Sequence, residues 1–153
     1  MAVSMLVLTA CGKHTVYHTF HTLPSGGWMR NDTLHFNVDI SDSVATTCRL
    51  TVAVRNHSNY PYCNLPLLIR CTDPHGQTVY VDTIQIQLAN QEGIWLGNGW
   101  GGLYEKVTPA GILHTAGSGV YFMTVASLLP DEVLPGIRDV GIMLQKTAAA
   151  PAQ

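Results

Sequence analysis

Apolar and polar residues alternate along most of this chain, and that period of two constrains the fold more than any other feature. Successive side chains of a strand point to opposite faces, so every second residue of such a segment enters one core. The alternation predicts five buried faces: Leu34, Phe36, Val38 and Ile40; Leu50, Val52 and Val54; Leu65, Leu67, Ile69 and Cys71; Ile84, Ile86 and Leu88; Val140, Ile142 and Leu144. The segment 120–127 is apolar on both faces, which predicts a central strand.

Short strands separated by turns predict an all-β fold. Turn signals rich in Pro, Gly and Asp occur at 24–27, 73–76 and 134–136, and helical periodicity is nearly absent. This arrangement favours an antiparallel β-sandwich of the jelly-roll kind. With 153 residues in all, we expect a single sandwich domain over 25–146, a linker and first strand within 11–24, and a disordered tail at 147–153.

The N-terminal segment indicates where the chain works. Residues 1–10 form a short apolar run that ends in Leu8-Thr9-Ala10 before Cys11, which is the layout of a secretory signal segment. The small residues before a cysteine resemble a bacterial lipobox, in which Cys11 becomes the acylated first residue of the mature chain. The alternative is an ordinary buried strand. No Lys or Arg precedes the run, which is consistent with a natural start upstream of Met1.

Four motifs follow one another in the order and spacing of one known family. They are Asn56-His57-Ser58-Asn59-Tyr60-Pro61-Tyr62-Cys63-Asn64-Leu65, then Asp73-Pro74-His75-Gly76 with Asp82-Thr83, then Gly93-Ile94-Trp95-Leu96-Gly97-Asn98-Gly99, and Leu134-Pro135-Gly136-Ile137-Arg138-Asp139-Val140-Gly141. The chain thereby resembles the GldH family of gliding-motility lipoproteins over nearly all of its mature length. The resemblance implies a lipoprotein linked to the gliding apparatus and, by association, to the type IX secretion machinery. It implies no enzymatic activity.

The expected partners follow from the same resemblance. They are envelope proteins of the gliding and secretion machinery, together with a membrane that holds the lipid anchor. The net charge of −2 and a charged fraction of 12% offer no basic surface for nucleic acid, and no small-molecule substrate is expected. In the lipoproteins that this chain resembles, acidic residues after the cysteine mark export to the cell surface, and residues 12–15 contain none. We therefore expect an outer-membrane protein that faces the periplasm.

Catalytic and metal-binding patterns are weak. Asp131-Glu132 is the one adjacent acidic pair, and we expect it to be a solvated loop; no nucleophile elbow, Walker loop or HExxH motif occurs. His14, His18 and His21 have a spacing that suits metal ligands on a helix. Here they lie in a linker that runs into an edge strand, where His18 and His21 point to opposite faces. We expect no cofactor and no metal.

Aromatic residues are the candidate contact residues. Exposed aromatic side chains on sandwich loops anchor protein interfaces or stack on sugars. Trp100 has Gly99 and Gly101 as neighbours within a long exposed connection, 93–102, so we predict that Trp100, Tyr104 and Trp28 contact a partner. The alternative is that Trp28 and Trp95 close the ends of the sandwich as core, which we favour for Trp95. A lipid-anchored carbohydrate-binding module remains the second function; a calcium site or several coplanar exposed aromatics would favour it.

Two further predictions concern covalent chemistry. If the strands around 49–55 and 65–71 pair as a hairpin, Cys48 and Cys71 lie opposite each other on the core side, and a disulfide joins them. The alternatives are three reduced thiols or strands in different sheets. The triplet Asp42-Ser43-Val44 resembles the O-glycosylation signal of exported proteins in the same bacterial group, so Ser43 is a candidate for glycosylation.

Overall fold

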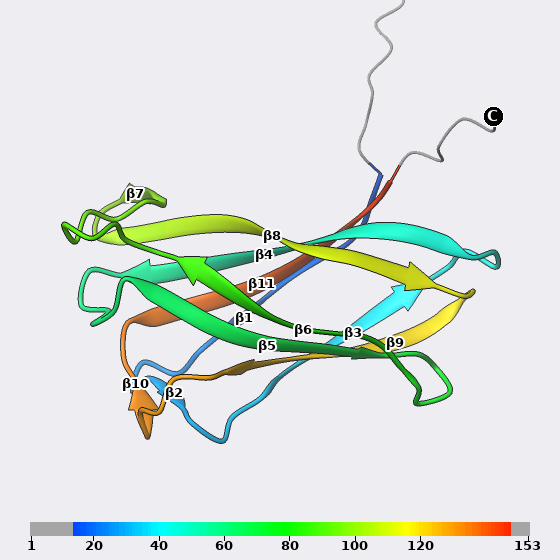
Figure 1. Cartoon of the computed structure of the whole chain (residues 1–153), viewed down its shortest axis with the longest axis horizontal. Coiled ribbons are helices and arrows are strands. Elements are labelled where there is room, and N and C mark those ends of the chain that lie inside the picture. The colour runs from blue at the N-terminus through cyan, green and yellow to red at the C-terminus, as the bar shows by residue number, and fades with distance from the viewer. Residues whose placement is uncertain (1–13, 148–153) are drawn as a thin grey trace, which may run out of the picture.

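The computed structural model describes residues 14–147 and consists of two facing antiparallel sheets (Figure 1). We call the first the β4 sheet, in which the order is β1 (Thr15–Thr22), β11 (Ile137–Lys146), β4 (Thr46–His57), β8 (Leu103–Thr115) and β7 (Asn98–Trp100). We call the second the β5 sheet, in which the order is β3 (Leu34–Ile40), β9 (Gly119–Ser127), β5 (Asn64–Thr72) and β6 (Thr78–Gln87). A small third sheet pairs β2 (Trp28–Met29) with β10 (Val133–Leu134).

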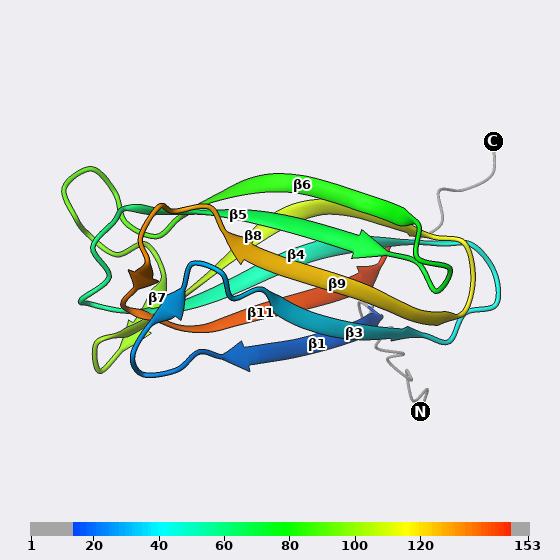
Figure 2. The same cartoon turned by 90° about the horizontal axis from the view of Figure 1, so that it is seen from below.

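The strand order is that of a jelly roll. Counted along the chain, the eight long strands have the order 1-8-3-6 in one sheet and 2-7-4-5 in the other. Figure 2 shows the four strands of the β5 sheet in front of the β4 sheet. This topology joins two Greek keys around one core. The predicted antiparallel sandwich of jelly-roll type is therefore confirmed.

The core lies between the two sheets, and all five predicted faces point into it. Their exposed fractions are 9% or less, and they stack with residues of β8 and β9: Leu34, Phe36, Val38, Ile40, Leu50, Val52, Val54, Leu65, Leu67, Ile69, Cys71, Ile84, Ile86, Leu88, Val140, Ile142, Leu144, Leu113, Tyr121, Met123 and Val125. Apolar burial of this kind contributes about 25 cal/mol per Å². The alternation in the sequence thus determines which side of each strand is buried.

The strand β9 differs in part from its prediction. It is central, because it pairs with β3 on one side and β5 on the other. Only one of its two apolar faces is buried, however: Val120 is 40% exposed and Phe122 is 49% exposed. In a two-layer sandwich each sheet has one covered face, and no further layer covers the β5 sheet in the described part of the chain.

The predicted pairing of β4 with β5 is wrong. The segment 58–63 carries the chain from one sheet to the other, so the two strands face each other across the core instead of forming a hairpin. Facing sheets lie about 10 Å apart, whereas the Cα atoms of a disulfide lie within about 7 Å. Cys48 and Cys71 both face the core, but in this structure both are free thiols.

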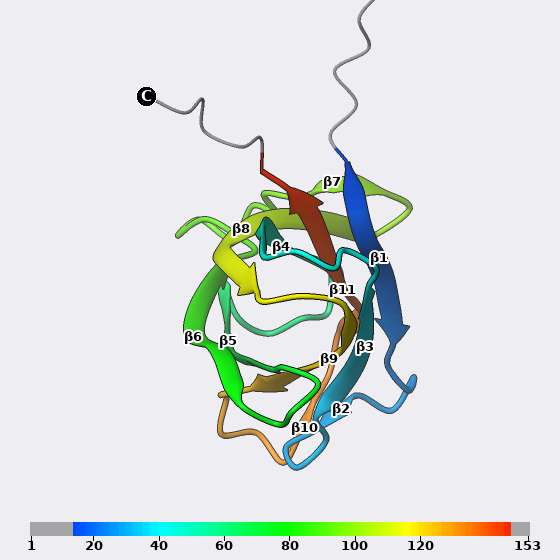
Figure 3. The ribbon, with the colours of Figure 1, turned by 90° about the vertical axis from the view of Figure 1, so that its right-hand side faces the viewer.

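The start of β1, the end of β11 and the strand β7 lie on the same side of the molecule (Figures 1 and 3). Figures 1 and 3 both show the start of β1, the end of β11 and the short strand β7 rising from the outer side of the β4 sheet. In Figure 1, β7 is at one end of the long axis, and the beginning of β1 is displaced toward the other. The first strand is part of the sandwich, because β1 pairs with β11 along its length.

Within residues 14–147, no helix is long and apolar enough to cross a membrane. Thr147, the first residue of the predicted tail, donates its backbone N–H to the carbonyl of Thr47 at 2.9 Å. The signal segment, Cys11 and residues 148–153 lie outside the described residues.

Candidate contact surface

Trp100 is at the tip of a tight hairpin. The strands β7 and β8 pair through Trp100 and Leu103, which leaves Gly101 and Gly102 as a two-residue turn. Both glycines have positive φ, 61° and 80°, which is the backbone of a type I′ hairpin turn and strongly favours glycine. The turn holds Trp100 away from the core with 92% of its surface exposed. The sequence prediction of an exposed Trp100 is therefore confirmed, and its role as a contact residue stays a prediction.

A stack of aromatic rings supports this hairpin from below. The ring of Tyr104 is 5.8 Å from that of Trp95 in a stacked arrangement, and Trp95 in turn is 6.5 Å from Tyr60. A Cβ atom at Gly99 would overlap the Tyr104 ring, so glycine is needed there. Tyr104 and Trp95 are both half-buried. Trp95 packs against the core as predicted. Tyr104 stacks on Trp95, and its role as a contact residue stays a prediction.

Trp28 is not a surface residue, and its predicted contact role is wrong. Only 1% of its surface is exposed, and its indole N–H donates to the carbonyl of Asp32 at 2.9 Å. The reason is the small sheet of β2 and β10, which covers one end of the sandwich and turns Trp28 and Leu134 inward. The alternative from the sequence, that Trp28 closes an end of the sandwich as core, is confirmed. The strand that covers it could not be foreseen, because it is about a hundred positions away.

A hollow of about 400 Å³ lies beside the Trp100 hairpin. Its lining is Arg55, Asn98, Gly99, Trp100, Leu103 and Glu105. The Arg55 Nε–H donates to Glu105 at 2.6 Å, and the guanidinium carbon is 4.0 Å from the centroid of the Phe20 ring. The hydrogen bond to Glu105 raises the pKa of Arg55, so its charge is fixed. The hollow is thus bordered by one exposed aromatic ring and one paired charge.

The charges around Arg55 form a network across four strands. Asp139 is 4% exposed, although it is on the outer face of β11. It accepts a hydrogen bond from the Thr22 hydroxyl at 2.7 Å and lies 3.6 Å from Arg55 and 3.7 Å from Arg138. A buried carboxylate needs such partners because desolvation is costly. These side chains fasten the outer face of the β4 sheet.

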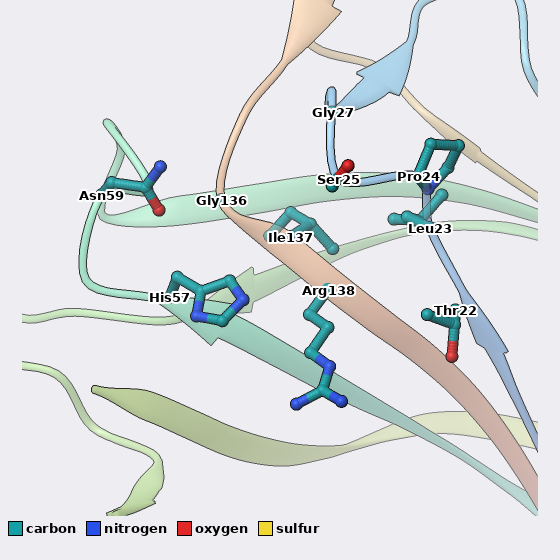
Figure 4. Close-up of a pocket in the computed structure, with 10 residues that line it drawn as sticks. All are labelled: Thr22, Leu23, Pro24, Ser25, Gly27, His57, Asn59, Gly136, Ile137 and Arg138. Carbon is teal, nitrogen blue, oxygen red and sulfur yellow. The ribbon is translucent and has the colours of Figure 1, made fainter. Parts of the chain in front are cut away.

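A second hollow, of about 300 Å³, lies between the loop 23–27 and the segment 136–138 (Figure 4). Its side chains are mostly hydrogen-bond donors, including Arg138, His57 and Asn59. Figure 4 shows His57 and Asn59 on one wall and Pro24 and Ser25 on the other. Within the described residues no hydrogen bond joins Ser25 to His57, so no nucleophile and base are paired here.

The remaining sequence candidates are scattered. Asp131 accepts a hydrogen bond from the Tyr62 hydroxyl at 2.9 Å. Its neighbour Glu132 takes no part in this hydrogen bond. His18 and His21 point to opposite faces, as predicted: His18 is near Phe20 on the outside, and His21 packs edge-on against Phe36. No three His, Cys, Asp or Glu side chains of residues 14–147 are grouped as metal ligands.

Ser43 is exposed in the loop 41–45 between β3 and β4, and its glycosylation stays a prediction. The neighbouring Asp42 pairs with Lys146 at 2.7 Å, which holds this loop against the end of β11. Among the thiols, Cys63 is exposed, and burial raises the pKa of both Cys48 and Cys71, that of Cys71 to about 12. The buried thiols are therefore protonated and unreactive at neutral pH.

The chain is similar to gliding-motility lipoproteins. The family model of the GldH lipoprotein matches residues 15–144. The gliding motility lipoprotein GldH of Flavobacterium johnsoniae is 30% identical over 106 residues, which are 69% of this chain and 65% of that protein. A GldH homolog of Christiangramia forsetii is 26% identical over 152 residues, which are 94% of this chain and 91% of that protein.

Among solved structures, an Eiger TNF from S. frugiperda aligns with a TM-score of 0.40 and 12% identity over 89% of this chain and 95% of that one. That likeness is too low to support an argument. The family model, by contrast, covers nearly all of the residues that form the sandwich. This chain therefore belongs to the GldH lipoprotein family.

Proposed function

We propose that this protein is a lipid-anchored, non-catalytic component of the gliding-motility and type IX secretion machinery, and that it acts by binding other envelope proteins. The observation that carries the proposal is the family match over residues 15–144. The names of the two relatives add the link to gliding. The anchor is an acyl group on Cys11, and the site is the inner leaflet of the outer membrane, because residues 12–15 contain no acidic export signal.

The surface of the sandwich is consistent with a binding role. Within residues 14–147, the exposed tryptophan and the exposed phenylalanine belong to opposite faces: Trp100 rises from the β4 sheet, and Phe122 lies on the outer face of the β5 sheet. Both are held by rigid strands, which suits contact residues because little side-chain entropy is lost on binding. The acidic and histidine side chains of the described part are paired with structural neighbours or dispersed, and this arrangement favours binding over acid–base chemistry.

The proposal is tested by capture from native membranes. The full chain with a C-terminal tag is expressed in its own host, crosslinked in intact cells and purified, next to the variants Trp100→Ala and Phe122→Ala. We expect envelope proteins to be recovered with the parent chain. We expect less recovery with the Phe122→Ala variant, which changes the sheet that contains neither β1 nor β11. Recovery of the tagged chain alone, at normal abundance in the membrane, would contradict a protein-binding role.

The location is tested separately. A Cys11→Ser variant should leave the membrane fraction, and protease added to intact cells should not cut the parent chain until the outer membrane is permeabilised. Digestion of the parent chain in intact cells would place it on the cell surface and refute the periplasmic orientation.

A further inference from the structure

Charge is divided unequally between the β4 sheet and the rest of the described chain. The strands of the β4 sheet contain five cations, Arg49, Arg55, Lys106, Arg138 and Lys146, and only two carboxylates, Glu105 and Asp139. The other described residues contain two cations, Arg30 and Arg70, and eight carboxylates, Asp32, Asp39, Asp42, Asp73, Asp82, Glu92, Asp131 and Glu132. The strands of the β4 sheet therefore carry a net positive charge within a protein whose overall charge is negative. Lys106 and Lys146 are opposite Val54 and Cys48, whose side chains face the core, so the excess on the outer face is that of Arg49, Arg55 and Arg138 over Glu105 and Asp139.

The same side of the molecule is where the chain enters the sandwich. Thr15 begins β1, and it is only four residues after Cys11. Four extended residues reach at most about 14 Å. A lipid on Cys11 would therefore hold the start of β1 within that distance of the bilayer interface. Figures 1 and 3 show this start on the outer side of the β4 sheet.

Exposed apolar side chains lie on that side as well. Trp100 is 92% exposed on its hairpin, and Val107 and Ile112 of β8 are 49% and 42% exposed. Tryptophan is the residue most typical of the membrane interface, where its ring lies at the level of the headgroups. Figure 1 shows the β7 hairpin near one end of the sheet and the start of β1 displaced toward the other. A tether and an aromatic contact at two separate points would restrict the orientation of the sandwich to rotation about the line between them, and the charged outer face would then decide which side meets the bilayer.

We infer that the outer side of the β4 sheet lies against the anionic phospholipid surface of the bilayer that holds the anchor, with Trp100 inserted at headgroup level. Charge complementarity and apolar contact act together in such surface binding. The inference rests on the proposed acylation of Cys11. Its consequence is that the β5 sheet, with Phe122, Asp39 and Asp82, faces away from the bilayer and toward protein partners.

The test uses the acylated full chain, purified from native membranes and reconstituted into vesicles of phosphatidylethanolamine and phosphatidylglycerol that contain brominated acyl chains. Bromine quenches only tryptophan that lies near the lipid. Trp28 is buried and Trp95 half-buried in the fold, so the difference between the parent chain and Trp100→Phe reports on Trp100. We expect the parent to be quenched and the quenching to be lost in Trp100→Phe.

A matched control moves the reporter to the other face. In the double variant Trp100→Phe with Phe122→Trp, the indole lies on the β5 sheet. We expect this variant to be quenched no more than the single variant Trp100→Phe. A second pair tests the charges: Arg49→Glu, on the outer face of β4, should weaken the quenching of Trp100, while Arg70→Glu, on the β5 sheet, should not. High salt should act like Arg49→Glu, because it screens exposed charges.

The outcomes separate the orientation from the anchor. If the chain fails to float with the vesicles, the anchor and with it the proposed function are wrong. If it floats but Trp100 is not quenched, or the indole at 122 is quenched instead, only the orientation is overturned. A photocrosslinker at position 100 that captures a protein in native membranes, with no lipid quenching, would likewise overturn the orientation and assign Trp100 to a protein partner.

Discussion

The two sheets bury similar apolar faces but differ in how their outer faces are built. On the β4 sheet, outer side chains are joined across strands that are far apart in the chain, such as Thr22 with Asp139 and Arg55 with Glu105. On the β5 sheet, Asp82 accepts a hydrogen bond only from the backbone of its neighbour Thr83, and Phe122 is open to solvent. The outer side chains of the β4 sheet are thus joined by pairs that are distant in sequence, whereas the side-chain hydrogen bond between strands of the β5 sheet, from Arg70 to Thr78, is long at 3.5 Å and joins neighbouring strands of one hairpin.

The largest expected difference concerns the carboxylates of the two faces. Asp139→Ala removes the acceptor of the Thr22 hydroxyl and a partner of Arg55, so we expect a loss of about 1 to 3 kcal/mol in the free energy of unfolding. Asp39→Ala, at an exposed position of β3, should cost less than about 0.5 kcal/mol. Urea unfolding of both variants measures the difference. Equal losses would show that the outer face of the β4 sheet is no better fastened than that of the β5 sheet.

The next prediction concerns the buried thiol of the β5 sheet. Burial raises the pKa of Cys71 to about 12, above the value of about 8.5 for a free thiol. The unfolded chain therefore loses the Cys71 proton at lower pH than the folded chain. The contribution of this group to the free energy of unfolding is fully present below about pH 8.5 and is lost as pH rises toward 12. We expect the free energy of unfolding to fall by roughly 1 kcal/mol per pH unit from this group.

The matched variant is Cys71→Ala, in which stability at neutral pH is lower but the alkaline slope is shallower. An unchanged slope would contradict the prediction. Labelling of the native chain with a thiol reagent gives an independent check: Cys63 should react, while Cys48 and Cys71 should react only after unfolding. Protection of Cys63 would place it in a contact that the isolated chain does not have.

A smaller effect is expected from Gly141→Ala on the outer face of β11. The added Cβ would lie 2.6 Å from the Phe20 ring, so the ring must move and the cation–π contact with Arg55 is disturbed. We expect the free energy of unfolding to fall by about 1 kcal/mol, from the steric overlap and the weakened cation–π contact together. The double variant with Phe20→Ala should show coupling between the two changes. Gly26→Ala, which has open space around it, is the control.

The smallest effect on stability concerns Ser43. Because its side chain is exposed in a loop between the sheets, Ser43→Ala should leave the unfolding free energy unchanged within about 0.5 kcal/mol. If Ser43 is glycosylated in the native host, the same variant lowers the intact mass by one glycan. A parent protein whose mass is explained by the polypeptide and its lipid alone would refute the modification.

Several features followed from the sequence alone. The period of two placed Phe36, Val52 and Ile69 in the core, because a strand can bury only alternate side chains. The glycines around Trp100 indicated its exposure, since a two-residue turn with positive φ admits few other residues. The family followed from four spaced motifs.

Other features depended on which strands meet in space. Cys48 and Cys71 have the predicted inward orientation but belong to facing sheets, and local pattern cannot show whether a chain turns back beside itself or crosses the core. Trp28 is buried because β10, far along the chain, covers it. The excess of arginine over carboxylate on the outer face of the β4 sheet likewise arises only when β4 and β11 are brought side by side, because long-range hydrogen bonding and packing, not neighbours in sequence, assign strands to sheets.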